Sequence, residues 1–236
     1  MKRIVILCGI VLWFIQLNAQ EKGVQFQNLT FQEALDKAKA EDKLVFMDCY
    51  TSWCGPCKLM LQDVFSREDV GQFMNARFVN LKLDMEKGEG PELARKYQVK
   101  VYPTFLILNE NGEVIHRMVG GMKVEDFLQN VQDGTGEYSL YSYEKRYAGG
   151  ERDSRFVYKY IETLSKAFMK ERMEQVLHEY WATLANQEKS NRENWSLVKR
   201  FVRDPLLPEY EYLLEHKGDF EAVVGKENVD RKIYDD

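Results

Sequence analysis

The chain has 236 residues, of which 44% are hydrophobic, 13% aromatic and 30% charged, a globular composition that excludes a disordered or collagen-like chain. The 33 basic and 38 acidic residues give a formal net charge of -5, which argues against a general nucleic-acid-binding protein. Four cysteines are too few for a disulfide-stapled miniprotein, and three histidines leave little for a metal site.

Residues 1–19 have the layout of a cleaved secretory signal. Two basic residues open the segment, residues 4–17 form an apolar run, and Ala19 is a small residue at the expected cleavage point. A transmembrane anchor and a buried N-terminal helix are the alternatives, but the run of about 14 residues is shorter than the roughly 20 that a membrane span needs. Cys8 lies inside the run, which is not the position of a lipid-attached cysteine. We therefore predict an exported protein.

Residues 20–136 alternate between strand and helix patterns, as an α/β domain does. Thr30 and Glu33 form a capping box that predicts the first helix start, and Asn111-Gly112 predicts a hairpin between the last two strands. Short apolar runs predict strands at Leu44–Tyr50, Phe78–Asp84, Thr104–Leu108 and Val114–Val119. Helices are predicted at Thr30–Ala40, Cys54–Phe65, Asp69–Asn75, Pro91–Tyr97 and Val124–Val131. This order predicts a mixed sheet with helices on both faces.

In residues 137–236 the strand patterns stop and aromatic residues become frequent. Helices are predicted at Ser154–Met169, Glu171–Ala185 and Asn194–Val202, with a more broken pattern at Leu213–Val224. Phe156, Tyr160, Leu164 and Phe168 recur at helical spacing, which predicts a buried stripe of the core. We therefore expect a smaller all-α domain, whose paired helices would suit a repeat-like stack.

The most informative motif is the run Ser52–Lys58, Ser-Trp-Cys-Gly-Pro-Cys-Lys, which follows a predicted strand and opens a helix. Two cysteines at i and i+3 bring both sulfurs to one face of a helix start, where unpaired N–H groups and the helix dipole favour a thiolate. Cys54 is therefore predicted to be the exposed nucleophile that attacks a substrate disulfide. Cys57 is predicted to be the shielded thiol that resolves the mixed disulfide.

The residues around the two cysteines are expected to support this chemistry. Gly55 lets the loop turn tightly, Pro56 supports the helix start, and Trp53 is placed to cover a substrate chain. Two other interpretations of the pair are open. Half of a zinc site would need a second pair or a set of histidines, and the three histidines are scattered along the chain. A purely structural disulfide would stabilise little, because the loop that it closes is short.

The run Val45–Lys58 resembles the active-site segment of the thioredoxin family, in which Cys-Gly-Pro-Cys is the characteristic form. Beyond the motif, Val101–Thr104 matches the cis-proline segment of that family, Phe105–Val119 matches its closing hairpin, and Gly120 matches the glycine that follows. The resemblance covers roughly residues 25–133. It implies an α/β thioredoxin fold for the first domain.

The resemblance also implies roles for single residues. Asp48 stands where thioredoxins have a buried acid, which would have a raised pKa and could take the proton of Cys57; an ordinary strand-end aspartate is the alternative. A cis bond between Tyr102 and Pro103 would present backbone to an incoming substrate strand, and a simple turn proline is the alternative. The implied substrate-binding residues are Trp53, Tyr102, Pro103, Thr104 and Gly120.

Two positions depart from the family pattern. Thioredoxins usually place a lysine near the buried acid, where this chain has Asn80, with Lys82 on the same alternating face of the strand. Whether Asp48 has a lysine partner is therefore left open. Cys49 stands where the family has an apolar residue, and strand alternation directs it away from Asp48. We interpret Cys49 as a packed small hydrophobic residue, with a third redox thiol as the alternative.

These features predict an exported thiol-disulfide oxidoreductase that reduces protein disulfides in a bacterial periplasm. The stretches Phe31–Lys43 and Asp63–Ser66 resemble bacterial envelope members of the family, and Cys-Gly-Pro-Cys resembles its reducing members. The resemblance implies disulfide-containing protein substrates and a membrane electron-transfer reductase as partners, with no cofactor, metal or nucleic acid. The alternatives are a disulfide isomerase or oxidase, and a binding module whose helical domain recognises a partner. The substrate and the oligomeric state are left open.

Overall fold

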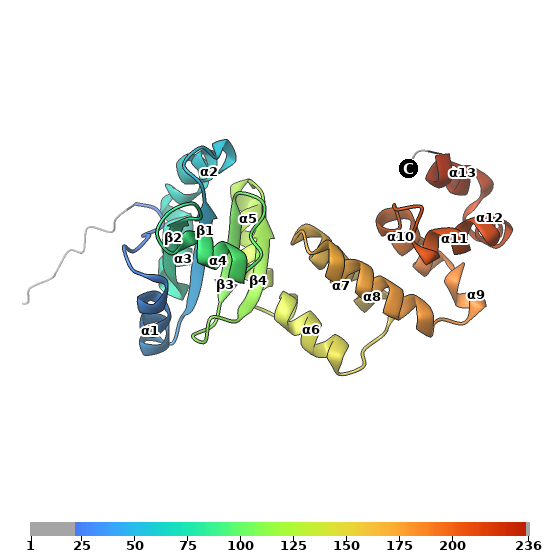
Figure 1. Ribbon diagram of the computed structural model, residues 1–236, viewed down its shortest axis with the longest axis horizontal. Helices are drawn as coiled ribbons and strands as arrows, with labels where there is room; N and C mark the ends of the chain where they lie inside the picture. Colours follow the sequence, from blue (N-terminus) through green and yellow to red (C-terminus); the bar gives the residue numbers. More distant parts are fainter. Residues whose placement is uncertain (1–21, 235–236) are drawn as a thin grey trace, which may run out of the picture.

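The computed structural model describes residues 22–234, so the predicted signal at residues 1–19 lies outside the described residues. A four-stranded mixed sheet with the strand order β2-β1-β3-β4 forms the centre of the first half of the chain (Figure 1). The strands are β1 (Leu44–Tyr50), β2 (Phe78–Asp84), β3 (Thr104–Leu108) and β4 (Val114–Val119). All four lie at the predicted residues. β1 pairs parallel with β2 and antiparallel with β3, and β3 pairs antiparallel with β4.

The strand register brings three chain segments together at one end of the sheet. Cys49 of β1 pairs with Thr104 of β3, and Thr104 pairs in turn with Val119 of β4. The carboxyl ends of β1 and β4 and the amino end of β3 therefore meet at the same end. The loop that leaves β1 here carries the two-cysteine motif, so this end of the sheet positions the candidate site.

Helices cover both faces of the sheet, as predicted (Figure 1). They are α1 (Phe31–Glu41), α2 (Gly55–Leu59), the π-helical segment η1 (Met60–Phe65), α3 (Glu68–Arg77), α4 (Gly90–Lys96) and α5 (Val124–Gly134). α1 and α4 pack against the face that carries Val45, Met47 and Cys49. η1, α3 and α5 pack against the opposite face, which carries Phe46. Because strand side chains alternate between faces, Asp48 shares the face of Phe46.

The local signals in the sequence correspond to real contacts. The Thr30 hydroxyl accepts the N–H of Glu33, and the Glu33 carboxylate accepts the N–H of Thr30, which completes the predicted capping box. In the hairpin, the Asn109 side chain accepts two backbone N–H groups of the turn, and Gly112 adopts a φ of 75° that favours glycine. The helix predicted at Cys54–Phe65 differs in detail, because it divides into α2 and η1.

The remainder of the chain is mostly helical (Figure 1). Its helices are α6 (Leu140–Ala148), α7 (Ser154–Lys166), α8 (Lys170–Thr183), α9 (Asn186–Lys189), α10 (Arg192–Phe201), α11 (Pro208–Glu215), α12 (Lys217–Val224) and α13 (Lys226–Tyr234). α6, α9 and α13 lie outside the predicted helices. In α6 the buried Leu140, Tyr143 and Tyr147 follow helical spacing, but the exposed Tyr141 within the helix and Tyr138 before it obscure the period. No helix within residues 22–234 combines the length and apolar character needed to cross a membrane.

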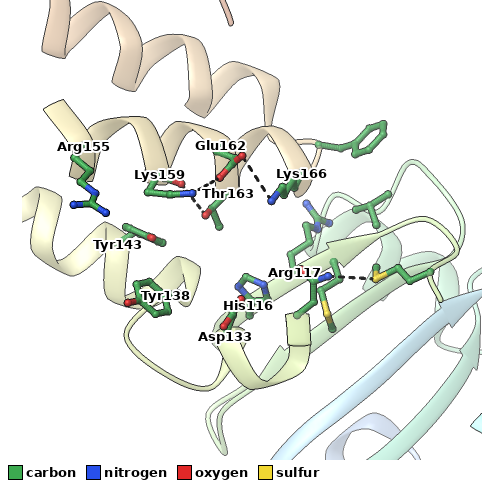
Figure 2. A pocket seen from close by; sticks show the side chains of 15 residues that line it. His116, Arg117, Asp133, Tyr138, Tyr143, Arg155, Lys159, Glu162, Thr163 and Lys166 are labelled. Carbon is green, nitrogen blue, oxygen red and sulfur yellow. Dashed lines mark hydrogen bonds and ion pairs between the residues drawn. The ribbon is translucent and has the colours of Figure 1, made fainter. Parts of the chain in front are cut away.

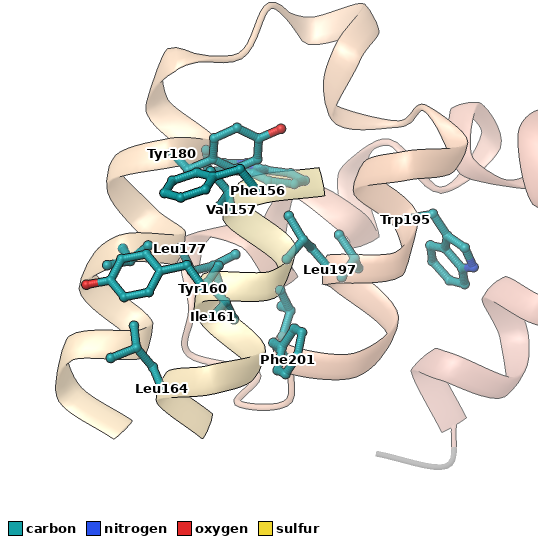
Figure 3. Packing of buried hydrophobic residues seen from close by; sticks show 14 of the residues in the cluster. Phe156, Val157, Tyr160, Ile161, Leu164, Leu177, Tyr180, Trp195, Leu197 and Phe201 are labelled. Atoms are coloured by element: carbon teal, nitrogen blue, oxygen red, sulfur yellow. The ribbon is translucent and has the colours of Figure 1, made fainter. Parts of the chain in front are cut away.

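A second apolar core fills the helical region (Figure 3). Phe156, Tyr160 and Leu164 of α7 are buried in it together with Leu177 of α8. The ring of Tyr143, from α6, stacks on that of Tyr160 with a centroid distance of 5.7 Å. Three of the four residues of the predicted stripe are therefore core residues.

Phe168, the fourth residue of that stripe, is 64% exposed, so its prediction as a core residue is wrong. α7 ends two residues earlier, where the N–H of Phe168 donates to the Ser165 carbonyl (3.1 Å) and the N–H of Met169 donates to the Leu164 carbonyl (3.0 Å). These bonds form a Schellman motif, which places Phe168 in the left-handed region with a φ of 55°. Glycine is usual at this position, because a side chain there is strained.

Candidate active site

The two-cysteine motif lies where the chain leaves β1 and enters α2. Cys54 is the N-cap residue of α2, and it forms a disulfide with Cys57. The N–H of Cys57 donates a hydrogen bond to Cys54 Sγ over 3.1 Å. An N–H group of the first helical turn, which has no partner inside the helix, is therefore directed at this sulfur. The same contact would stabilise negative charge on Cys54 after reduction of the disulfide.

The structure corrects the predicted exposure of Cys54. Cys54 and Cys57 are both 3% exposed, so in this oxidised form the first cysteine is as shielded as the second. The reason is that the disulfide holds Cys54 against the start of α2. The exposed residues next to the two cysteines include Trp53, Gly55 and Pro56. A partner that approaches the disulfide therefore meets these three residues first.

Trp53 is held at the rim of the site by two contacts. Its indole N–H donates to both carboxylate oxygens of Glu86 at 3.0 Å. Its ring meets the ring of Tyr102 edge-on, with a centroid distance of 6.0 Å. Two of the predicted substrate-binding residues, Trp53 and Tyr102, are thus brought together. Glu86 follows β2 in an exposed turn, and no motif in the sequence marks it.

The segment around Pro103 lies at the same end of the sheet. The Tyr102–Pro103 peptide bond is cis, and the Pro103 carbonyl accepts the N–H of Gly120 at 2.9 Å. Gly120 adopts a φ of 91°, where glycine is favoured. Thr104 is 1% exposed, its hydroxyl donates to the Val101 carbonyl at 2.7 Å, and it borders a cleft together with Lys100 and Val119. It is buried because β3 lies between β1 and β4.

Asp48 lies near the carboxyl end of β1 and pairs with a lysine. It is 1% exposed, and Lys82 Nζ lies 2.5 Å from its Oδ2. The pairing that the sequence left open is made because Lys82 of β2 stands opposite Asp48 in the parallel register. Asn80 instead donates to the side chain of Asn75 at 3.0 Å. The second oxygen of Asp48, Oδ1, has no hydrogen-bond partner among the described residues.

Burial dominates the electrostatics of Asp48. Loss of solvation raises the pKa of its carboxyl group, and the charge and hydrogen bond of Lys82 oppose this rise only in part. The carboxyl group therefore keeps its proton to a higher pH than an exposed aspartate does. A buried acid of this kind can accept a proton from a neighbouring thiol and return it later.

Cys49 is a free cysteine on the opposite face of β1. It is fully buried among the apolar side chains of the face that α1 and α4 cover. Burial raises the pKa of its thiol, and the charge of Asp48 raises it further. A buried, protonated thiol is a poor nucleophile, so this geometry favours the packed residue over the third redox thiol.

Among the described residues, no second set of zinc ligands lies beside the cysteine pair. His116 lies in β4, His178 in α8 and His216 between α11 and α12, so the histidines come from separate elements. Across residues 22–234, no group of three or more His, Cys, Asp or Glu side chains is placed to hold a metal ion. The two sulfurs are instead bonded to each other.

Known proteins share this domain. The family model of the thioredoxin-like domain matches residues 31–135. A thioredoxin-like protein of Synechocystis sp. is 34% identical over 110 residues, a match that covers 47% of this chain and 96% of that protein. Thioredoxin Y1 of Arabidopsis thaliana chloroplasts is 31% identical over 112 residues, which are 48% of this chain.

The matches cover only part of this chain, and only part of some relatives. The chain covers 62% of thioredoxin Y1 and 62% of its rice counterpart, thioredoxin Y, or about three fifths of each. A solution structure of a disulphide-isomerase candidate from Bacteroides thetaiotaomicron has 50% identity and covers 50% of this chain and 97% of that one, with a TM-score of 0.46. The family match ends at residue 135, so the helical region from residue 137 onward lies outside it.

Replacing Asp48 by asparagine is expected to stabilise the oxidised protein at pH 7 by about 1–3 kcal/mol, because the neutral amide has no buried charge whose desolvation opposes folding. The pKa of Asp48 is raised in the folded state, so the free energy of unfolding falls as the pH rises from the unfolded-state pKa, about 3.9, to the folded-state pKa, and it stays lower above that. Below about pH 4 the carboxyl group is protonated in both states, and the gain should disappear.

Urea unfolding at pH 7 and at pH 3.5 measures this difference, with Asp63→Asn as a control at an exposed aspartate of η1. The control should change the free energy of unfolding little at either pH. A loss of stability in Asp48→Asn at pH 7 would show that the ion pair with Lys82 outweighs the burial of the carboxylate.

Proposed function

The chain belongs to the thioredoxin family, and from this premise we propose that it is an exported oxidoreductase that reduces protein disulfides in a bacterial periplasm. The observation that carries the proposal is the Cys54–Cys57 disulfide at the start of α2, with the N–H of Cys57 directed at Cys54 Sγ. This arrangement supports a thiolate on Cys54 in the reduced protein, which is the attacking species in disulfide exchange.

The proposed reaction is a two-electron exchange between dithiol and disulfide. The Cys54 thiolate attacks one sulfur of the substrate disulfide; the S–S bond of the substrate breaks, and its other sulfur leaves as a thiolate. Cys57 then loses its proton and attacks the Cys54 sulfur. This second step releases the remaining substrate sulfur and forms the Cys54–Cys57 disulfide. The substrate gains two electrons and the two protons that the protein thiols lose.

Asp48 is the proposed acceptor for the proton of Cys57. Cys57 and Met60 are buried one helical turn apart, and Met60 packs with Phe46 on the face of β1 that Asp48 shares. The raised pKa of Asp48 suits this role, since a carboxyl group with an ordinary pKa would hold the proton too weakly near neutral pH. Lys82 would steady the charge of Asp48 in the ionised state.

The proposed direction, reduction of the substrate, requires a source of electrons. The oxidised Cys54–Cys57 pair must be reduced after each turnover, and we propose a membrane electron-transfer reductase with its own dithiol as the donor. The Cys-Gly-Pro-Cys sequence supports a reducing role. A disulfide isomerase or oxidase is the second candidate, favoured by the exposed apolar residues Trp53 and Phe168, which would suit the holding of an unfolded substrate.

Cys57→Ser is expected to accumulate a mixed disulfide with a reduction substrate such as insulin, because Cys54 can attack but nothing resolves the product. Cys54→Ser should accumulate none and should abolish reductase activity, because the attacking thiolate is lost. Mass spectrometry detects the trapped species, and an insulin-reduction assay measures the activity. Cys49→Ala is the control that keeps full activity. Trapping by Cys49 in the absence of Cys54 would contradict the assignment.

The proposed export predicts a specific mature N-terminus. When the full chain is produced in a bacterium with an outer membrane, protein recovered from the periplasm should begin at Gln20. N-terminal sequencing or intact-mass measurement of that fraction checks the site. Recovery of the chain in the cytoplasm with its first residues intact would contradict the export proposal.

A further inference from the structure

Two adjoining clefts lie where the end of β4 faces the turn between α7 and α8. The first, of about 710 Å³, is bounded by β4, α5 and α7 (Figure 2). The second, of about 530 Å³, is bounded by residues 98–101, β4 and the start of α8. Arg117, Val119 and Phe168 line both clefts. The two clefts therefore adjoin, and together we call them the β4 groove.

The β4 groove begins beside the cysteine motif. Val119 lies at the end of the sheet that carries the motif, and Val101, the neighbour of Tyr102, lines the groove. A Cβ atom placed on Gly121 would lie 3.7 Å from Pro56 Cβ, so the chain that leaves β4 borders the motif directly. A polypeptide whose disulfide meets Cys54 can therefore continue into this groove with its flanking residues.

The groove follows the edge of the sheet. β4 is an edge strand that pairs only with β3 within the described chain. Four consecutive residues of β4, 116–119, line the first cleft, so the cleft runs along this strand. An edge strand presents unpaired backbone groups to which an extended peptide can hydrogen-bond. The geometry thus suits an extended segment rather than a helix.

The far wall of the groove presents an aromatic side chain at a strained position. Phe168 is 64% exposed, although it occupies the left-handed position of the Schellman motif where glycine is preferred. Neither burial nor local geometry accounts for an aromatic residue there. Tyr138 and Val101, which also line the groove, are 51% and 37% exposed. The groove therefore offers apolar contacts that the described chain leaves uncovered.

The charge of the groove is opposite to that of the whole chain. Seven lysine and arginine side chains line it against four acidic ones, in a chain with a net charge of -5. Three cations share the carboxylate of Glu162. Its oxygens lie 3.1, 3.8 and 2.6 Å from the side-chain nitrogens of Lys159, Lys166 and Arg200. Arg155 forms no ion pair within residues 22–234. The excess of cations favours an acidic ligand.

His116 adds a neutral donor on the β4 side of the groove, across from α7 (Figure 2). Its Nδ1 accepts the N–H of Leu140 at 3.3 Å, and burial lowers its pKa to about 4, so the ring is neutral with its proton on Nε2. The charge of Asp133 opposes this shift but does not outweigh burial. Nε2 has no hydrogen-bond partner in the described part of the chain, which leaves it free for a ligand oxygen.

We propose that the β4 groove binds the segment of a protein substrate that flanks its reducible disulfide, and that it selects segments that are extended, acidic and carry an apolar residue for Phe168. The inference rests on the proposed function and names the class of substrate for the same site. The helical region thus supplies one wall of the substrate-binding surface, opposite the edge strand of the thioredoxin domain.

The test compares three disulfides with the full chain lacking only residues 1–19. The first is a short peptide with one cysteine between glutamates and leucines, joined to free cysteine by a disulfide. The second has lysine in place of each glutamate, and the third is hydroxyethyl disulfide, which is too small to reach the groove. We expect kcat/KM to be higher for the acidic peptide than for the basic one by about tenfold or more at low salt.

Two variants remove the proposed contacts. Phe168→Gly deletes the ring and places glycine where it is favoured, so the thermal unfolding temperature should stay the same or rise. Lys159→Gln with Lys166→Gln removes two cations, and Lys145→Gln with Lys199→Gln is the matched control at exposed lysines outside the groove. Each test variant should lower kcat/KM for the acidic peptide by about tenfold and leave that for hydroxyethyl disulfide unchanged; the control should change neither.

A second measurement does not depend on redox chemistry. The acidic peptide with serine in place of cysteine should bind the oxidised protein in a fluorescence anisotropy titration, and both test variants should weaken that binding. If hydroxyethyl disulfide is not reduced by the unmodified chain, the proposed function fails while this titration still tests the groove. Equal binding of acidic and basic peptides would overturn the inference. A dimer that Phe168→Gly abolishes would also overturn it, since a second copy would then cover the groove.

Discussion

The hydrogen bond from the N–H of Cys57 to Cys54 Sγ is the interaction on which the account depends. It exists because the short loop after β1 leads into α2, so that Cys54 caps a helix whose first N–H groups lack internal partners. The sheet register then places Pro103 and Gly120 at the same end. The cysteine pair, Pro103 and Gly120 therefore lie close together because β1, β3 and β4 all have an end at this side of the sheet.

The residues around the disulfide are fixed by contacts from other elements. Burial raises the pKa of Asp48, and the charge of Lys82 on the neighbouring strand lowers it in part. Trp53 is held between Glu86 and the ring of Tyr102. Each contact joins segments that are distant in sequence, which explains why a compact motif needs the whole domain around it.

The sequence predicted the sheet and the cysteine pair well, because strand alternation, a capping box and the two-cysteine spacing are local signals. It could not predict Glu86, whose role comes from a turn that happens to face Trp53. The partner of Asp48 needed the β1–β2 register, which places Lys82 opposite it. Phe168 kept the helical spacing of a core residue, but the helix had already ended. Cys54 was predicted to be exposed. In the folded chain its disulfide holds it against the start of α2, and the sequence carries no local signal for this shielding.

The reduction potential of the Cys54/Cys57 pair tests the central claim most directly. It can be measured in the chain lacking residues 1–19 by equilibration in redox buffers, with Cys49→Ala as the control that should give the same value. Stabilisation of the Cys54 thiolate favours the reduced form and raises the potential, so a reductase requires this stabilisation to be small enough to keep the potential near that of thioredoxin, about -270 mV. A value near that of a strong disulfide donor, about -120 mV, would contradict the account and make the protein an oxidant of its substrates.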